Sequence, residues 1–466
     1  MASTGDHLWL RPTTAKEEYF EVGHQKGVTQ VYYCLDLMCL KPLDDELVRS
    51  ALTHLYKKVP LLRLCLRQRE GQLWLRQMAR CDIDFKGLGH EARKDVEEEL
   101  MSYTYNTAEG PMWCVRFLRD VPCETSSLQD PDFSHKYTLL LGIHHSLGDG
   151  FTNIKICGFM HSLLDDVAAG RPVDDDEQLG EHLGDEFARQ LYEDERRRLT
   201  EDPELLKECK EELLGITTNR PLFLDVLPEP RNDDVRTCSV EKHFDADVTS
   251  SFRKKCKAEG VTVHSGLVGA ISVAFVKILE GVREIPDEFE LLSGHDVNLR
   301  RYYTGDTSNI LGVHLPTFGF KMSFRVSKDP LHNFWPSVKV FHEKFKSALN
   351  SRSPVRNVAL RMMMRSKSEN FDDYFKDSGV PDCYFTVSNV GDVTSMVPGD
   401  GDCVRVMKLT TMSSLRNMTN FMCFYVKSYK GRLHVNLGFS TRFLDYAMAN
   451  RILDLMGTAI SAVCQA

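Results

Sequence analysis

Hydrophobic and polar residues in the first part of the chain form short runs with strand character and longer stretches with helical spacing. Residues 28–38 (VTQVYYCLDLM) are rich in β-branched and aromatic side chains, which is typical of a β-strand. In residues 43–59 the apolar positions recur every three or four residues, which predicts a helix. Residues 61–77 indicate a β-hairpin with Glu70-Gly71 at its turn.

The clearest pattern is an apolar run followed by a polar loop and a helix. Residues 137–144 (YTLLLGIH) are almost uniformly apolar, as expected for a strand that is buried on both faces. Residues 151–167 have apolar side chains at helical spacing, which predicts a helix. The polar residues between the two elements therefore lie at the end of a buried strand.

A charged region separates the two halves of the chain. Acidic and basic residues dominate from 174 to 214, and the surrounding region has interspersed prolines at 172, 203, 221, 228 and 230, so it is the candidate connection between domains. Residues 183–214 indicate a charged, solvated helix rather than a random linker or an acidic binding tail.

The second half again interleaves strands and helices. We expect a strand at 239–244, two helices at 246–259 and 263–279, and a hairpin formed by 420–428 and 432–440. Residues 288–299 are expected to begin as a strand, 383–389 to form a further strand, and 444–463 to form a last helix with Thr441 as its N-cap. This order predicts an α/β protein with mixed sheets.

Bulk composition narrows the function classes. A length of 466 residues predicts two domains of about 200 residues each. The net charge of −9 gives no electrostatic reason to expect nucleic acid as a partner. The 14 cysteines include no C-x-x-C pair, which argues against a zinc or redox site and favours a reducing compartment. We expect a cytoplasmic protein with no signal peptide and no transmembrane segment.

The polar loop at 144–150 (HHSLGDG) is the one constellation that suggests chemistry. Side chains alternate across a strand, so His144 and His145 should point in different directions, one toward a cleft and one into the protein. A neutral imidazole can take the proton of an attacking alcohol or amine and return it to a departing thiolate. Structural interpretations also exist: Asp149 is suited to cap the following helix, and Gly150 is suited to a turn.

The full pattern His144-His145-x-x-x-Asp149-Gly150 resembles the HHxxxDG motif of the CoA-dependent acyltransferase superfamily, which includes chloramphenicol acetyltransferase and nonribosomal-peptide condensation domains. The resemblance extends over most of the chain. Pro60-Leu61-Leu62-Arg63, the segment 110–113 and the segment 261–264 support it by their order and spacing. Only HHxxxDG is specific by itself.

The resemblance implies two chloramphenicol-acetyltransferase-like lobes with a tunnel between them. The lobes would be residues 1–175, which carry HHxxxDG, and 236–466, joined by a charged helical connection at 176–235. By the same resemblance His145 is the catalytic base and His144 is structural. Asp149 would form an ion pair with an arginine, for which we propose Arg300, with Arg301 as the second choice; an exposed surface charge is an equally good interpretation of Arg300.

An acyl-transfer site also needs donors for the oxyanion of its tetrahedral intermediate. Ser388 and Asn389 resemble an S-N-x-G segment of alcohol acetyltransferases and wax-ester-synthase relatives, and are the candidates for this role. The alternative is that Asn389 and Gly391 only shape a turn.

The sequence therefore predicts an acyltransferase that moves an acyl group from acyl-CoA, as co-substrate, to a small hydroxyl or amine acceptor. We expect no metal and no permanently bound cofactor, and a monomer, because two lobes in one chain can complete a site. The alternatives are a carrier-protein-dependent, amide-forming condensation enzyme, a catalytically silent binding protein of the same fold, and a thioester hydrolase.

Overall fold

The computed structural model covers most of the chain. It describes residues 9–465 except 79, 81, 120–131, 183–185, 219–220, 228–229, 232, 365–370, 376–380, 382, 417 and 419–420. The chain forms two compact units, and neither is continuous in sequence. Unit 1 contains residues 1–187, 299–315 and 392–414, and unit 2 contains 188–298, 316–391 and 415–466. This division differs from the contiguous lobes expected from the sequence, because two segments of the second half pack with the first.

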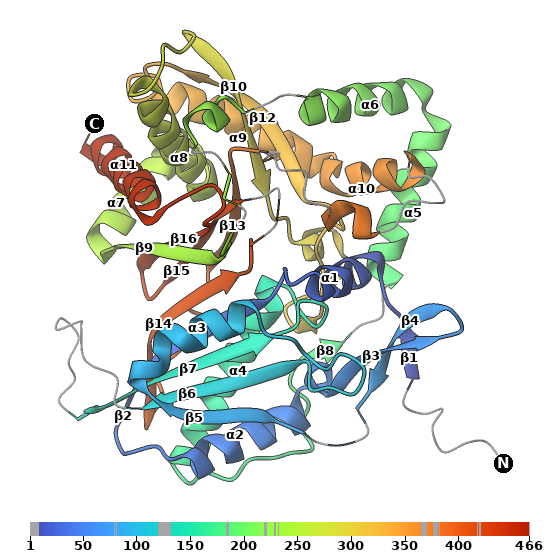
Figure 1. Cartoon of the computed structure of the whole chain (residues 1–466), viewed down its shortest axis with the longest axis vertical. Helices are drawn as coiled ribbons and strands as arrows, with labels where there is room; N and C mark the ends of the chain where they lie inside the picture. Colours follow the sequence, from blue (N-terminus) through green and yellow to red (C-terminus); the bar gives the residue numbers. More distant parts are fainter. Residues whose placement is uncertain are drawn as a thin grey trace. The chain divides into compact units, whose positions relative to one another are not determined.

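Unit 1 is built on a mixed five-stranded sheet with the order β14-β2-β7-β6-β5 (Figure 1). Only the β5–β6 pair is parallel. A three-stranded sheet, β1-β4-β3, and a short parallel pair, β11-β8, complete the unit. Its strands are β1 Trp9–Pro12, β2 Val31–Cys39, β3 Leu64–Arg69, β4 Gln72–Gln77, β5 Asp84–Gly89, β6 Trp113–Arg119, β7 His135–Ile143, β8 Glu181–His182, β11 Ile310–Leu311 and β14 Val404–Ser413.

Helices cover both faces of this sheet. They are α1 Ala15–Gln25, α2 Asp45–Lys58, α3 Arg93–Met101 and α4 Gly150–Ala168. Alternate side chains of β2 face opposite helices: Tyr33 contacts Asn153 of α4, whereas Asp36 contacts Arg93 of α3. Because both faces are covered, β7 is buried over most of its length, as its apolar sequence predicts.

Unit 2 is built on a mixed six-stranded sheet with the order β12-β10-β13-β15-β16-β9. Its strands are β9 Thr237–Phe244, β10 Glu288–His295, β12 Phe320–Ser327, β13 Phe385–Asp392, β15 Met422–Tyr429 and β16 Arg432–Ser440. Its helices are α5 Glu186–Glu201, whose first residues fall in unit 1, α6 Pro203–Thr218, α7 Ala246–Ala258, α8 Val263–Glu280, α9 Phe334–Asn350, α10 Ser353–Met364 and α11 Tyr446–Gln465. Helices α8 and α11 pack together, and side chains from both join the large hydrophobic core of this unit.

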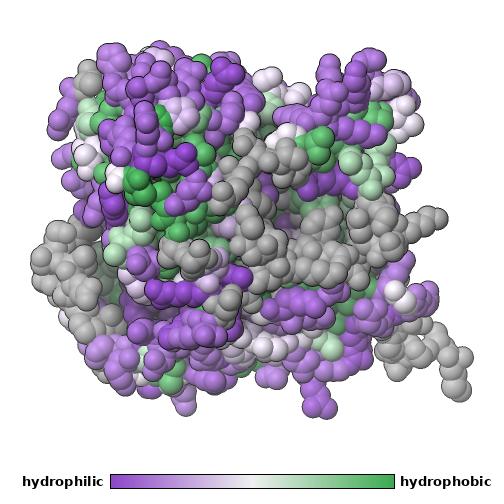
Figure 2. Space-filling model, turned by 45° about the horizontal axis from the view of Figure 1, so that its top comes forward, coloured by the Kyte–Doolittle hydropathy of each residue, from purple (hydrophilic) through white to green (hydrophobic). Residues whose placement is uncertain are grey.

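Helix α8 is the one helix among the described residues that is long and apolar enough to cross a membrane by length and composition. However, 72% of this 18-residue stretch is buried inside the protein, as is usual for a core helix. The face of the molecule shown in Figure 2 is mostly hydrophilic, with hydrophobic residues in smaller separate patches.

The structure confirms the α/β fold with mixed sheets and corrects two local predictions. The single helix expected at 183–214 is two helices, because Pro203 starts a new helix, and the Asp202 side chain accepts a hydrogen bond from the Leu205 N–H at 3.0 Å. Thr441 does not cap the last helix. Asp445 does so instead, accepting from the Met448 N–H at 2.8 Å, while Thr441 accepts from the Arg236 N–H.

Candidate active site

The predicted strand, loop and helix around HHxxxDG are present as β7, residues 144–149 and α4. Strand β7 ends at Ile143 and helix α4 begins at Gly150. Asp149 is the N-cap of α4, and its Oδ1 accepts from the Thr152 N–H at 2.9 Å. The loop is thereby fixed between a buried strand and a capped helix.

His145 keeps one ring nitrogen available. Its Nδ1 lies 2.9 Å from the carbonyl oxygen of Gly148. Because a carbonyl can only accept, Nδ1 carries the proton and Nε2 carries the lone pair. Among the described residues none hydrogen-bonds to Nε2, and the side chain is partly exposed. The ring therefore has the tautomer that a general base requires.

Helix α1 provides the surroundings of the His145 ring. The Phe20 ring stacks on it with a centroid separation of 3.8 Å and an interplanar angle of 6°. The Lys16 ammonium lies 4.3 Å from the centroid of Phe20. Burial, and then the Lys16 charge, lower the pKa of His145 to about 4, because both disfavour the imidazolium. His145 is therefore neutral at pH 7 and able to accept a proton.

His144 points elsewhere and is fully enclosed. Its Nδ1 accepts from the Ser146 N–H at 3.2 Å, so its Nε2 carries a proton, and that atom lies 3.2 Å from Glu21 Oε2. Burial alone would raise the pKa of Glu21, but hydrogen bonding and the charge interaction with His144 bring it below its ordinary value. His144 is 1% exposed, and its structural role stays a prediction.

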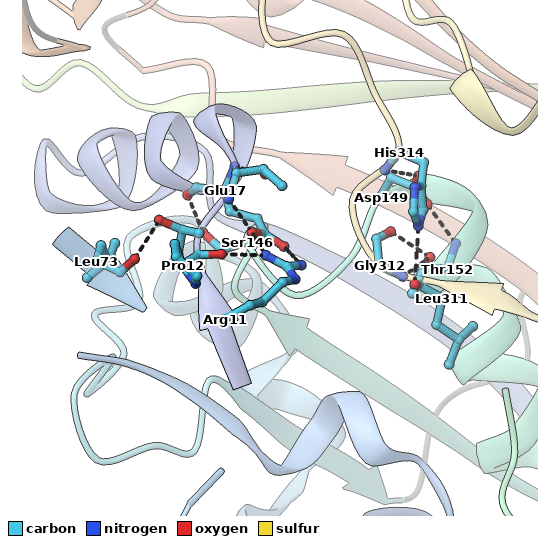
Figure 3. Close-up of polar contacts among 12 residues, drawn as sticks. Arg11, Pro12, Glu17, Leu73, Ser146, Asp149, Thr152, Leu311, Gly312 and His314 are labelled. Carbon is cyan, nitrogen blue, oxygen red and sulfur yellow. Dashed lines mark hydrogen bonds and ion pairs between the residues drawn. The ribbon is translucent and has the colours of Figure 1, made fainter. Parts of the chain in front are cut away.

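Helix α1 is itself anchored to the histidine loop. Thr14 and Glu17 form a reciprocal capping box at its start. The Glu17 carboxylate also accepts two hydrogen bonds of 2.8 Å from Arg11, and the Ser146 hydroxyl donates to the Glu17 carbonyl at 2.7 Å (Figure 3). These contacts hold Phe20 against His145.

The predicted ion pair between Asp149 and Arg300 is confirmed. Arg300 Nη1 lies 2.6 Å from Asp149 Oδ2, and both side chains are almost fully buried. The same oxygen accepts from the His314 N–H at 3.0 Å, and Arg300 Nη2 donates to the Thr152 hydroxyl at 2.8 Å. Burial alone would raise the pKa of Asp149, but Arg300 holds it below its ordinary value. Asp149 is thus both helix cap and ion-pair partner, and the interpretation of Arg300 as an exposed surface charge is wrong.

The glycine that needs an unusual backbone conformation here is Gly312 and not Gly150. Gly150 is the first residue of α4 and is not among the residues with positive φ, whereas Gly312 has φ 125°. The Gly312 carbonyl accepts from the Asp149 N–H at 3.2 Å and from the Thr152 hydroxyl at 2.8 Å (Figure 3). The turn interpretation of Gly150 is therefore wrong.

The two oxyanion candidates do not lie in the unit that carries His145. Ser388 and Asn389 are on β13 of unit 2. Asn389 Oδ1 accepts from the Gly391 N–H at 2.9 Å, and Gly391 has φ 77°. Because Asn389 and Gly391 both lie within β13, the turn of the alternative interpretation is not seen, and the oxyanion role of Ser388 and Asn389 stays a prediction.

Other histidines near the loop have structural contacts. The His161 Nε2 lies 2.8 Å from the Val404 carbonyl oxygen and is buried. His314 Nδ1 lies 2.9 Å from the Tyr303 hydroxyl, and burial followed by the Arg300 charge lowers its pKa to about 4. Within the described part of the chain no group of three or more His, Cys, Asp or Glu residues is placed to hold a metal ion.

Sequence reasoning missed Lys16, Phe20, Thr152 and Gly312. One signal was available: Thr14-x-x-Glu17 before an apolar position is the pattern of a capping box and predicts the start of α1. No local pattern links Gly312 to the histidine loop, because the contact spans more than 150 residues.

Neither a protein-family model nor a curated protein matches this sequence. Solved structures do match. The trichothecene 15-O-acetyltransferase from Fusarium sporotrichioides is 15% identical with a TM-score of 0.67, over 99% of this chain and 97% of that one. The first condensation domain of the CDA synthetase is 14% identical with a TM-score of 0.64, over 98% and 96%.

The chain has the fold of this acetyltransferase and of condensation domains. The epimerization domain of the third module of tyrocidine synthetase B shares this fold, with 14% identity and a TM-score of 0.64 over 98% of this chain and 97% of that one. In this chain residues 144–150 (HHSLGDG) directly follow the buried strand β7.

Proposed function

We propose that this protein is an acyltransferase in which His145 is the general base. It moves an acyl group from a thioester to the hydroxyl or amine of a small acceptor. The acyltransferase and condensation-domain fold supports the transferase class, and the geometry around His145 supports the role of that residue.

The proposed reaction is a direct attack without an acyl-enzyme. The lone pair on His145 Nε2 takes the proton of the acceptor's O–H or N–H as that atom attacks the thioester carbonyl. When the C–S bond breaks, Nε2 returns the proton to the departing thiolate. The products are the acylated acceptor and a free thiol, and His145 ends in its starting state.

One observation carries this proposal: His145 donates Nδ1–H to the Gly148 carbonyl and leaves Nε2 with its lone pair. The stacked Phe20 ring fixes the plane of the imidazole, and the low pKa keeps it neutral. Asp149 acts indirectly, because its contacts with Arg300 and Thr152 hold the loop on which His145 lies.

For the donor we propose acyl-CoA, since an acetyltransferase is among the similar structures. The second candidate is a thioester on a carrier protein, which the similar condensation domains favour. We also propose a monomer in a reducing cytoplasm. In support, the cysteines that the structure describes are free thiols, and most are buried.

The test is thiol release and product identification with purified protein. Acyl-CoAs from acetyl to palmitoyl and an acyl-loaded carrier protein are offered with panels of alcohols and amines, and the products are identified by mass spectrometry. We expect acyl transfer from CoA that is lost in His145→Ala and kept in His332→Ala, which removes an exposed histidine of unit 2.

Other outcomes of this experiment decide between the alternatives. Transfer only from the carrier protein would support the condensation reaction, and release of free acid would identify a hydrolase. Turnover that His145→Ala leaves unchanged would overturn the general-base role. Binding of acyl-CoA without any turnover would indicate a silent binding protein.

A further inference from the structure

The carbonyl group that sets the tautomer of His145 is shared by a second donor. Gly148 O accepts from His145 Nδ1 at 2.9 Å and from the side-chain amide of Asn153 at 3.1 Å. Asn153 lies in the first turns of α4, and its side chain is completely buried. A carbonyl oxygen has two lone pairs, so it accommodates both donors.

The contacts determine which way the Asn153 amide points. The side-chain atom that faces Gly148 O must be nitrogen, because two oxygens at 3.1 Å would repel each other. The same nitrogen lies 3.4 Å from the hydroxyl of Tyr33 on β2. Asn153 therefore links the Gly148 peptide to the central sheet of unit 1.

The sequence leaves room for this contact at Gly148, a position that the HHxxxDG motif does not specify. A Cβ added to Gly148 would lie 2.3 Å from Asn153 Oδ1 and 2.8 Å from Thr152 Cγ2. Gly148 is not among the residues with positive φ, so glycine is needed there for space and not for backbone conformation. Gly148 and Asn153 thus fit each other as a pair.

We propose that Asn153 is a positioning residue that fixes the Gly148 carbonyl so that His145 keeps its proton on Nδ1 and presents Nε2 to the acceptor. The inference rests on the proposed acyltransferase function and adds a residue to its machinery. Asn153 does not touch the substrate in this scheme; it acts only through the Gly148 peptide.

The physical reason lies in the proton cycle of His145. When Nε2 takes a proton, the Nδ1–H bond to Gly148 O becomes charge-assisted and stronger, provided that the carbonyl stays in line. Without the amide of Asn153 the Gly148 carbonyl loses one of its two donors, and the 3.2 Å bond from the Asp149 N–H to the Gly312 carbonyl is left to orient this peptide. The neutral ring then also populates the tautomer with its proton on Nε2, which donates and cannot act as a base.

The test replaces Asn153 by residues of similar shape that lack the N–H donor. Asn153→Leu is expected to lower kcat about 10- to 100-fold with KM within about twofold. Thr249→Val, which removes a buried hydroxyl in unit 2, is the control for a general loss of buried polar contacts and should leave kcat within about twofold.

A spectroscopic measurement separates this proposal from the proposed function. Nitrogen-15 shifts of the histidine rings, with His145 assigned by the signals lost in His145→Gln, report the tautomer without any substrate. We expect an Nδ1–H tautomer in the wild type and a mixture in Asn153→Leu. If that variant does not fold, Asn153→Asp keeps the shape and is measured instead. An unchanged tautomer in the variant would overturn the positioning role, whether or not the protein proves to be an acyltransferase.

Discussion

His145 in unit 1 and His295 in unit 2 occupy similar places, and only His145 has the contacts of a base. Each lies at or just beyond the end of a buried strand, β7 or β10, and burial lowers the pKa of both rings. His295 Nδ1 lies 3.2 Å from His264 Nε2, and its Nε2 lies 2.9 Å from the Ser293 hydroxyl. Both of its nitrogens are therefore in use, whereas His145 keeps Nε2.

Aromatic packing does not distinguish the two sites. Phe20 stacks on His145, and Phe345 lies with its ring centroid 4.9 Å from that of His295. A depressed pKa and an aromatic neighbour accompany burial in general, so neither identifies a catalytic histidine. The distinguishing feature is the His145 Nε2 atom, which has no hydrogen-bond partner among the described residues.

The largest expected effect comes from removing His145. His145→Ala should lower kcat/KM about 10²- to 10⁴-fold, because a positioned general base contributes that much. His145→Ala removes the stacking on Phe20 but breaks no ion pair, so the urea midpoint of unfolding should fall less than in the Asp149 variant. Steady-state kinetics and urea titration on the same sample check both statements. Retained activity in His145→Ala would mean that His145 is no more a catalytic base than His295.

Breaking the Asp149–Arg300 pair should come next. Asp149→Ala leaves a buried guanidinium unpaired and is expected to cost about 3–5 kcal/mol of unfolding free energy, with loss of activity because the loop moves. Asp149→Ala combined with Arg300→Met removes both charges and should cost less than the sum of the single changes. Urea titrations of the three variants measure this coupling, and strict additivity would contradict the ion pair.

Removing His295 tests the other side of the comparison. His295→Leu leaves Ser293 and His264 without a buried partner, so it should cost about 1–3 kcal/mol of stability and change kcat less than about threefold. Thermal unfolding and kinetics at pH 7 check this. A large loss of kcat in a folded variant would place His295 in the catalytic machinery.

The stability difference between wild type and His295→Leu should depend on pH in one direction. The unfolded chain protonates this histidine below about pH 6.5, and the folded protein does so only at much lower pH, so wild-type stability falls as the pH falls through that range. His295→Leu lacks this contribution. Its stability deficit should therefore narrow as the pH is lowered from 7 to 5.

The smallest expected effect comes from Lys16. Lys16→Gln removes a positive charge that disfavours the imidazolium, so the pKa of His145 should rise from about 4. The acid limb of the kcat/KM profile should move to higher pH by less than about one unit. Lys94→Gln, on the exposed surface of α3, is the control. A shift toward lower pH would contradict the assigned influence of Lys16.

Local sequence patterns predicted the strand and helix that flank the histidine loop, and the family resemblance predicted Arg300 as the ion-pair partner of Asp149. The apolar run of β7 and the spacing of α4 place the histidine loop without any knowledge of tertiary structure. The Asp149–Arg300 pair followed only from the resemblance, because its residues lie far apart in sequence. The stacking of Phe20 on His145 was not predictable, because it depends on how α1 crosses the loop and not on any spacing.

The sequence patterns also did not predict that β14, from the second half of the chain, belongs to unit 1. Strand β14 pairs with β2 along its whole length, although more than 350 residues separate them. The sequence analysis predicts no element at 404–413, and a local pattern does not name the neighbour of a strand. Sequence patterns therefore led to contiguous lobes and did not predict the discontinuous units.

Because unit 1 contains segments from late in the chain, it cannot be completed early during protein synthesis. A ribosome releases residues 1–187 long before it makes the segments at 299–315 and 392–414 that complete unit 1. Until then β2 has an unprotected edge and Asp149 lacks its counter-ion, so a nascent or truncated chain holds both histidines without a finished site. Activity is thus expected only once residue 414 has been made, and a gene divided after residue 187 should yield no working half.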